Sequence, residues 1–148
     1  MFMHGSTFGG HPVSAAVALE NIAVIKRENL LQNVYNLEGY FKDELERMAK
    51  DHPVVREVRG MGFFWAVEIK AERADGTPLE GDEYQKYFKE VLSRKLLEGG
   101  LICRFEDKED PAVQYSPALI ADKEVISKIC EITDGALTEL EQELGYRN

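Results

Sequence analysis

The sequence is poor in the residue types that cross-link chains or bind transition metals. It contains 2 cysteines and 3 histidines among 148 residues. Cys103 and Cys130 lie far apart and form neither a CxxC motif nor a Cys/His ligand spacing. A disulfide framework and a zinc site are therefore not indicated. We expect both cysteines to be reduced, buried and hydrophobic in character.

Glycine is missing from the most acidic segment, residues 106–111, whose sequence is EDKEDP. Its clustered carboxylates could bind a hard cation such as Ca²⁺. Without a glycine at the turn and without alternating oxygen ligands, a solvated loop is the favoured interpretation. We therefore expect no metal site.

Long apolar runs and an excess of positive charge are also absent. No apolar run of about 18 residues, the length that indicates a membrane span, occurs, and the first residues lack the pattern of a signal peptide. Lys and Arg number 18 against 27 Asp and Glu, so the net charge is −9. Nucleic acid and anionic membrane surfaces would repel most of such a surface. We expect a cytoplasmic protein.

Apolar periodicity and turn residues predict one α+β domain, with short strands covered by helices on one face. Its composition, 44% hydrophobic and 30% charged, is ordinary for a globular domain. The expected helices span residues 12–28, 30–52, 82–98 (capped by Asp82) and 122–144, and the expected strands span 54–59, 63–70, 101–104 and 113–116. Residues 71–81 are expected to form a loop.

The densest chemistry lies in residues 4–12, whose sequence is HGSTFGGHP. Ser6 and Thr7 offer hydroxyl groups, and the glycine pair that follows lets a ligand approach the backbone. Pro12 is well placed as the first residue of a helix. The free N–H groups and positive dipole end of that helix suit an anion such as phosphate. A simple Ser/Thr/Gly helix cap is the alternative.

Residues 4–18, HGSTFGGHPVSAAVA, resemble the H-G-x-T-[FY]-x-G-H-P-x-x-[AC]-A-x-A segment of class III, omega-type aminotransferases, which are pyridoxal-phosphate enzymes of fold type I. Residues 58–63, VRGMGF, resemble the V-R-G-x-G-[LMF] strand entry of the same family. The resemblance covers nearly the whole chain. It implies a cofactor-phosphate loop with the interdomain helix in residues 1–28 and the C-terminal small α+β domain in residues 29–148.

The resemblance also implies roles for single residues. The threonine that matches Thr7 reaches across a homodimer interface to the phosphate of pyridoxal 5'-phosphate, and we place Ser6 in the same site. Residues 100–104, GLICR, resemble the G-L-[IL]-x-R segment, whose arginine clamps a substrate carboxylate. The planar guanidinium of Arg104 suits that task because it pairs bidentately with a carboxylate. The alternative is a surface arginine paired with the acidic loop.

The segment after Arg104 departs from the family. Residues 116–119, SPAL, replace a P-P-L ending, and the interval from Arg104 to Pro117 is longer than usual. Gln114 stands where ornithine- and aminobutyrate-type relatives have a carboxylate-binding arginine. By resemblance this favours an omega-type or β-alanine/pyruvate-type specificity over an ornithine type.

The Schiff-base lysine and the large domain of such an enzyme lie upstream of the matching portion. The lysines of this chain fall on polar helix faces, at a strand end or in the acidic loop, so none is expected to be catalytic. We expect the chain alone to be inactive and not to retain the cofactor. We also expect apolar surface to be exposed on the first helix and at Phe63, Phe64 or Trp65, with self-association or a disordered N-terminus. The alternative function is a stand-alone acidic module that binds a small anion or a protein.

Overall fold

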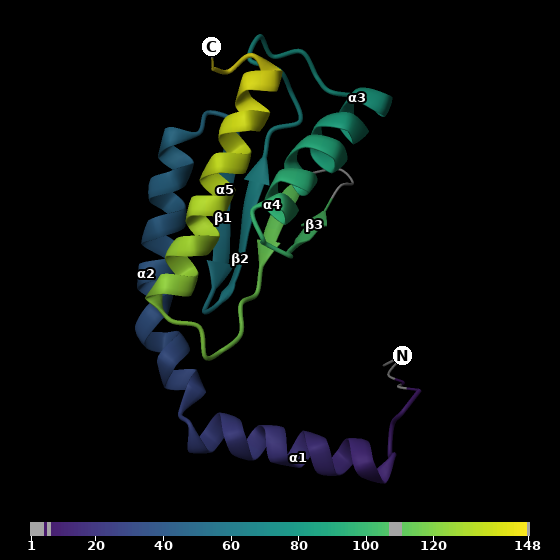
Figure 1. Ribbon diagram of the computed structural model, residues 1–148, viewed down its shortest axis with the longest axis vertical. Helices are drawn as coiled ribbons and strands as arrows, with labels where there is room; N and C mark the ends of the chain where they lie inside the picture. The colour runs from purple at the N-terminus through teal and green to yellow at the C-terminus, as the bar shows by residue number, and fades with distance from the viewer. Residues whose placement is uncertain (1–4, 6, 107–110, 148) are drawn as a thin grey trace, which may run out of the picture.

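The computed structural model describes residues 5, 7–106 and 111–147, and it shows an α+β domain with one projecting helix (Figure 1). The predictions for Ser6 and for most of the acidic loop lie outside the described residues. The elements in chain order are α1 (Pro12–Arg27), α2 (Leu30–Asp51), β1 (Val55–Met61), β2 (Phe64–Ile69), α3 (Gly81–Gln85), a π-helical segment η1 (Lys86–Ser93), α4 (Arg94–Glu98), β3 (Arg104–Glu106), β4 (Ala112–Tyr115) and α5 (Lys123–Leu144).

The four strands form one antiparallel sheet in the order β1-β2-β4-β3. The helices α2 and α5 and the continuous segment α3–η1–α4 cover one face of this sheet (Figure 1). Because side chains alternate along a strand, Trp65, Val67 and Ile69 of β2 point into the core. Phe64 and Ala66 point to the opposite face, which none of these helices covers.

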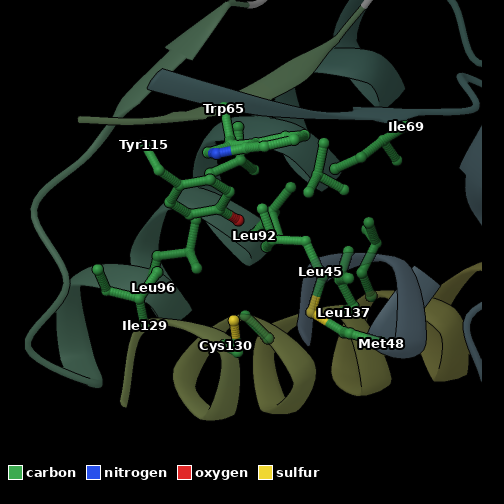
Figure 2. Close-up of a cluster of buried hydrophobic side chains, with 14 of the residues drawn as sticks. Leu45, Met48, Trp65, Ile69, Leu92, Leu96, Tyr115, Ile129, Cys130 and Leu137 are labelled. Atoms are coloured by element: carbon green, nitrogen blue, oxygen red, sulfur yellow. The ribbon is translucent and has the colours of Figure 1, made fainter. Parts of the chain in front are cut away.

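Aromatic rings form the centre of the core between sheet and helices (Figure 2). The Phe41 ring of α2 lies 6.2 Å from Phe63, 6.3 Å from Trp65 and 6.3 Å from Tyr115, measured between ring centroids. The Trp65 Nε1–H donates a hydrogen bond to the Gly62 carbonyl at 2.8 Å, so the buried indole has a polar partner. Phe63 and Trp65 are therefore core residues, and the apolar exposure expected at Phe63, Phe64 or Trp65 is found at Phe64.

A buried charged cluster joins the end of α2 to the last turns of α5. His52 and Glu141 are almost fully buried, and His52 Nδ1 lies 3.1 Å from Glu141 Oε2. The other ring nitrogen lies 3.1 Å from Asp134 Oδ1. Glu141 also accepts hydrogen bonds from the Val54 N–H and from Arg147. Every one of these buried groups has a partner, which offsets the cost of removing them from water.

Two predicted boundaries were wrong. The strand expected at 101–104 begins only at Arg104. Gly100 adopts a φ of 89°, and the Leu101 N–H donates a hydrogen bond to the Leu96 carbonyl that ends the preceding helix. Asp82 does not cap the third helix, since the helix begins one residue earlier, at Gly81. Its carboxylate lies instead in the first turn, near the positive end of the helix dipole.

Helix α1 projects from the domain where it joins α2 (Figure 1). Its apolar side chains Val13, Val17 and Leu19 are each more than 60% exposed. Apolar residues lie on all sides of this helix, a pattern typical of buried helices. The predicted apolar surface on the first helix is thus confirmed. Across the described residues, no helix combines the length and the apolar character needed to span a membrane.

The close approach of Gly60 to β2 gives a test of this packing. A Cβ at Gly60 would lie 2.4 Å from the Phe64 carbonyl oxygen and 2.6 Å from Trp65 Cδ2. We expect Gly60→Ala to lower the free energy of unfolding by about 2–3 kcal/mol, because backbone and a buried indole must both shift. Urea denaturation followed by Trp65 fluorescence measures the change.

Gly39→Ala is the matched control. Gly39 lies within α2, and a Cβ there would meet no atom within 4 Å. Alanine should raise the free energy of unfolding by about 0.5–1 kcal/mol through its higher helix propensity. Equal effects of the two substitutions would contradict the packing described here.

Candidate functional site

A tight turn leads from the N-terminal motif into α1. Thr7 is exposed in this turn. The His11 N–H donates a hydrogen bond to the Phe8 carbonyl at 3.1 Å, which holds the turn together. Gly10 has a φ of 79°, a conformation that glycine adopts without strain. Pro12 is the first residue of the helix, as predicted. Thr7 therefore lies in the turn that directly precedes the first residue of α1, Pro12.

The beginning of α1 offers hydrogen-bond donors to a ligand. The N-cap residue is His11, whose side chain makes no capping hydrogen bond, and the first turn contains no acidic residue. The first N–H groups of a helix have no partner within the helix, and the helix dipole adds positive potential there. Together with the Thr7 hydroxyl, these groups match the oxygen atoms of a phosphate.

Arg104 belongs to a row of four residues that crosses the sheet. The strand register pairs Arg59 with Ala66, Ala66 with Gln114, and Gln114 with Arg104. Directly paired residues point to the same side of an antiparallel sheet. Because Val113 and Tyr115 flank Gln114 and are buried in the core, the row lies on the face away from the helices. We call these four residues the sheet row.

Arg104 and Gln114 line a hollow of about 410 Å³ at the edge of the sheet. The remaining lining residues are mostly apolar: Leu101, Ile102, Cys103, Tyr115, Ser116, Pro117 and Ile129. Burial raises the pKa of the Cys103 thiol, and it raises the pKa of the Tyr115 hydroxyl far above its usual value. Both groups are therefore neutral at physiological pH, and the guanidinium of Arg104 supplies the charge. The hollow suits a carboxylate attached to an apolar group.

The two cysteines differ in their surroundings, which corrects the expectation that both are buried. Both are free thiols, but only Cys130 is buried, while Cys103 is half-buried at the hollow. Burial raises the pKa of Cys130 to about 12. The thiolate is the reactive form of cysteine, so neither residue is activated as a nucleophile.

The alternative role of Arg104, pairing with the acidic loop, involves residues 107–110 and lies outside the described part of the chain. The structure places Arg104 itself at the rim of the hollow, with an exposed side chain.

Arg59 is a site residue that the sequence interpretation missed. A second hollow of about 320 Å³ lies beside the first and is lined by Arg59, Gly60, Phe64, Trp65, Ala66 and Gln114. Gln114 lines both hollows. The sequence placed Arg59 at a strand end, but the pairing of that strand with its neighbours sets its position opposite Ala66. The register could not be obtained from a local pattern.

No lysine in the described residues occupies a closed site. All nine described lysines are exposed or half-buried. The two half-buried ones, Lys70 and Lys95, make hydrogen bonds to protein oxygens. Lys70 Nζ donates to the Pro53 carbonyl at 2.8 Å. The hydrogen bond from Lys95 to Glu139 raises the pKa of Lys95, whereas a nucleophilic amine requires a lowered pKa.

The described residues do not bring Thr7 and Arg104 together. Helix α1, about 24 Å long for its 16 residues, separates Thr7 from the domain (Figure 1). The turn before α1 and the hollow at Arg104 are thus two separate candidate regions of the described chain.

Known proteins are similar to this chain both in sequence and in fold. The family model described as aminotransferase class-III matches residues 1–137. The protein named "Probable aminotransferase" of Mycobacterium tuberculosis is 39% identical over 139 residues, which are 94% of this chain and 29% of that protein. An ornithine aminotransferase of Staphylococcus carnosus is 36% identical over 86% of this chain and 27% of its own length.

Among solved structures, the PMP-bound form of an aminotransferase from Vibrio fluvialis matches with a TM-score of 0.78 and 32% sequence identity. The match covers 97% of this chain and 30% of that structure. This chain therefore spans less than a third of the length of each protein that it resembles.

Proposed function

Because the chain belongs to the class-III aminotransferase family, we propose that it is the C-terminal part of a pyridoxal-phosphate-dependent transaminase. The enzyme moves amino groups between an amine or amino acid and a keto acid. The observation that carries the proposal is the exposed beginning of α1, where Thr7 and unpaired helix N–H groups offer a phosphate site. Residues 1–28 supply this loop and the interdomain helix, and residues 29–148 supply the small domain.

The phosphate of the cofactor fits the donors at the beginning of α1. Thr7 contributes its hydroxyl, and the first-turn N–H groups and dipole of α1 contribute positive potential. Ser6, the neighbour of Thr7 in the sequence, contributes a second hydroxyl in this proposal. When bound, pyridoxal 5'-phosphate supplies the electron sink that amino-group transfer requires. The residues of this chain bind and orient its phosphate end.

Arg104 binds the carboxylate of the substrate. Its guanidinium stands at the rim of an otherwise neutral, largely apolar hollow, which matches an amino or keto acid with a short carbon chain. The apolar lining packs against the carbon chain of the substrate, while Arg104 pairs with its carboxylate. Gln114, directly opposite Arg104, carries no charge, which favours an omega-type or β-alanine/pyruvate-type specificity over an ornithine type.

The exposed apolar side chains of α1 support assembly into a homodimer. In this proposal the enzyme is cytoplasmic. The small residues Ser14, Ala15 and Ala16 near its start allow another helix or subunit to approach closely. In such an assembly, Thr7 serves the cofactor held mainly by the other subunit. The remaining cofactor contacts and the reactive lysine come from the large domain.

Substitution of Thr7 tests the phosphate site. In the complete polypeptide that contains this sequence, Thr7→Ala should weaken cofactor binding by roughly 10- to 100-fold, because a hydrogen bond to a charged oxygen is lost, about 1.5–3 kcal/mol. Cofactor titration followed by visible absorbance measures the affinity. Thr77→Ala, in the exposed loop before α3, is the control and should leave the affinity unchanged.

The 148-residue chain by itself should not form a covalent adduct with the cofactor. No lysine in the described residues has the closed environment that such a bond requires. After incubation with equimolar pyridoxal 5'-phosphate and borohydride reduction, peptide mass spectrometry should show only trace, scattered labelling of surface lysines. Stoichiometric labelling of one lysine, together with transamination by the chain, would falsify this prediction.

Gln114 is neutral where ornithine-type relatives have an arginine, and this difference predicts which substrates the enzyme prefers. The complete polypeptide should prefer pyruvate as amino acceptor with β-alanine or an uncharged amine as donor, as judged by kcat/KM over a panel of pairs. A preference for ornithine with α-ketoglutarate would show that the specificity assignment is wrong while leaving the transaminase function intact.

A further inference from the structure

We propose that Arg59 is a second carboxylate-binding residue, and that it holds the carboxylate of long ω-amino acids while Arg104 holds that of the short keto acid. The proposal rests on the transaminase function above. It assigns the hollow at Arg104 and the hollow at Arg59, which share Gln114, to the two substrates.

The sheet row sets the geometry. Arg59 and Arg104 stand at its two ends, with Ala66 and Gln114 between them. Neighbouring strands lie about 4.8 Å apart, so the two arginine Cα atoms are separated by about 14 Å along the row. All four side chains project from the same face. The row thus provides two positive positions at fixed separation, each at its own hollow.

Arg59 has a protein partner and is still accessible to a ligand. Its Nη2 lies 3.4 Å from Glu68 Oε2, and Arg56 Nη1 lies closer to the same carboxylate, 3.0 Å from Oε1. Arg59 therefore shares Glu68 with a second guanidinium group. The Arg59 side chain is 55% exposed, so its remaining N–H donors can reach a carboxylate of the substrate.

The second hollow has an apolar floor suited to a methylene chain. Phe64 is 61% exposed on the outer face, and Ala66 leaves room above the sheet between Arg59 and Gln114. Gln114 lines both hollows, and its amide offers donor and acceptor atoms to either side. A substrate that extends past Gln114 toward Arg59 can pack its carbon chain on Phe64.

Transamination chemistry requires two carboxylate positions when its substrates differ in length. The reacting carbon of donor and acceptor must occupy the same point, because both react with the same cofactor. In pyruvate the carboxylate is attached directly to that carbon, whereas in an ω-amino acid several methylene groups intervene. The two carboxylates therefore reach different places, and two arginines in one row can hold each of them.

The test compares KM and kcat for several substrates in single-substitution variants of the complete polypeptide. The donors are 4-aminobutanoate, 5-aminopentanoate, 6-aminohexanoate and an amine without a carboxylate, and the acceptor is pyruvate. Arg59→Gln should raise KM for the longer ω-amino acids roughly 10- to 100-fold, the loss of a charged hydrogen bond. It should leave kcat with the carboxylate-free amine and KM for pyruvate within about twofold. Arg104→Gln should raise KM for pyruvate instead.

Two further variants separate ligand binding from structural support. Arg94→Gln removes an exposed arginine of α4 that pairs with Glu98 and lines neither hollow of the row, so it should change no KM. Arg59→Lys keeps the charge beside Glu68 and should fold normally, yet lose the bidentate geometry and raise KM for the longer donors several-fold. Urea denaturation of each variant checks its folding.

Three results would overturn the proposal: unchanged KM values in both Arg59 variants, equal increases for pyruvate and ω-amino acids, or the same effect from Arg94→Gln. A wild-type polypeptide that transaminates no pair at all would instead reject the proposed function. An active wild type with unaffected Arg59 variants rejects only the second carboxylate position.

Discussion

The burial of one face of the four-stranded sheet is the constraint on which the rest of the structure depends. Once Trp65 and Val67 enter the core, strand alternation forces Ala66 to the other side, and the register then aligns Arg59, Gln114 and Arg104 with it. A slip of one residue in β1 or β3 would turn an arginine toward the core, and a slip in β2 would expose Trp65 and Val67. The packing that stabilises the domain therefore also positions its charged groups.

Local patterns were sufficient to predict most elements. Apolar periodicity located α2 and α5, and the proline after His52 and the aspartate before Lys123 marked their ends. The start of β3 was placed too early because the preceding helix ends with the hydrogen bond from Leu101 N–H to Leu96, which delays the strand. The π-helical form of η1 was not predicted because it depends on tertiary contacts. Phe88 within η1 stacks on Phe105 of β3 at 5.8 Å, a contact between residues that no local pattern joins.

The candidate site was predictable in part for a similar reason. Thr7 and Arg104 lie in contiguous motifs, so a resemblance could find them, whereas Arg59 acquires its position only through the pairing of three strands. The sequence predicted exposure at Phe63, Phe64 or Trp65 without deciding among them, and the structure exposes Phe64, whose side chain points away from the core. Alternation assigns these three residues correctly only after one of them is known to face the helices.

The charge distribution is compatible with the two proposed anion-binding regions of an acidic chain. The net charge of −9 acts on a ligand at long range, but salt screens charges beyond about 8 Å at physiological ionic strength. At the sheet row, Arg59 and Arg104 place positive charge at the two ends, Glu68 is shared between Arg59 and Arg56, and the neutral thiol of Cys103 adds no opposing charge. At the beginning of α1 the donors are backbone N–H groups, which carry no net charge to be compensated. Carboxylate and phosphate binding therefore need only the local arrangement of these groups, and the acidic remainder of the surface does not exclude either ligand.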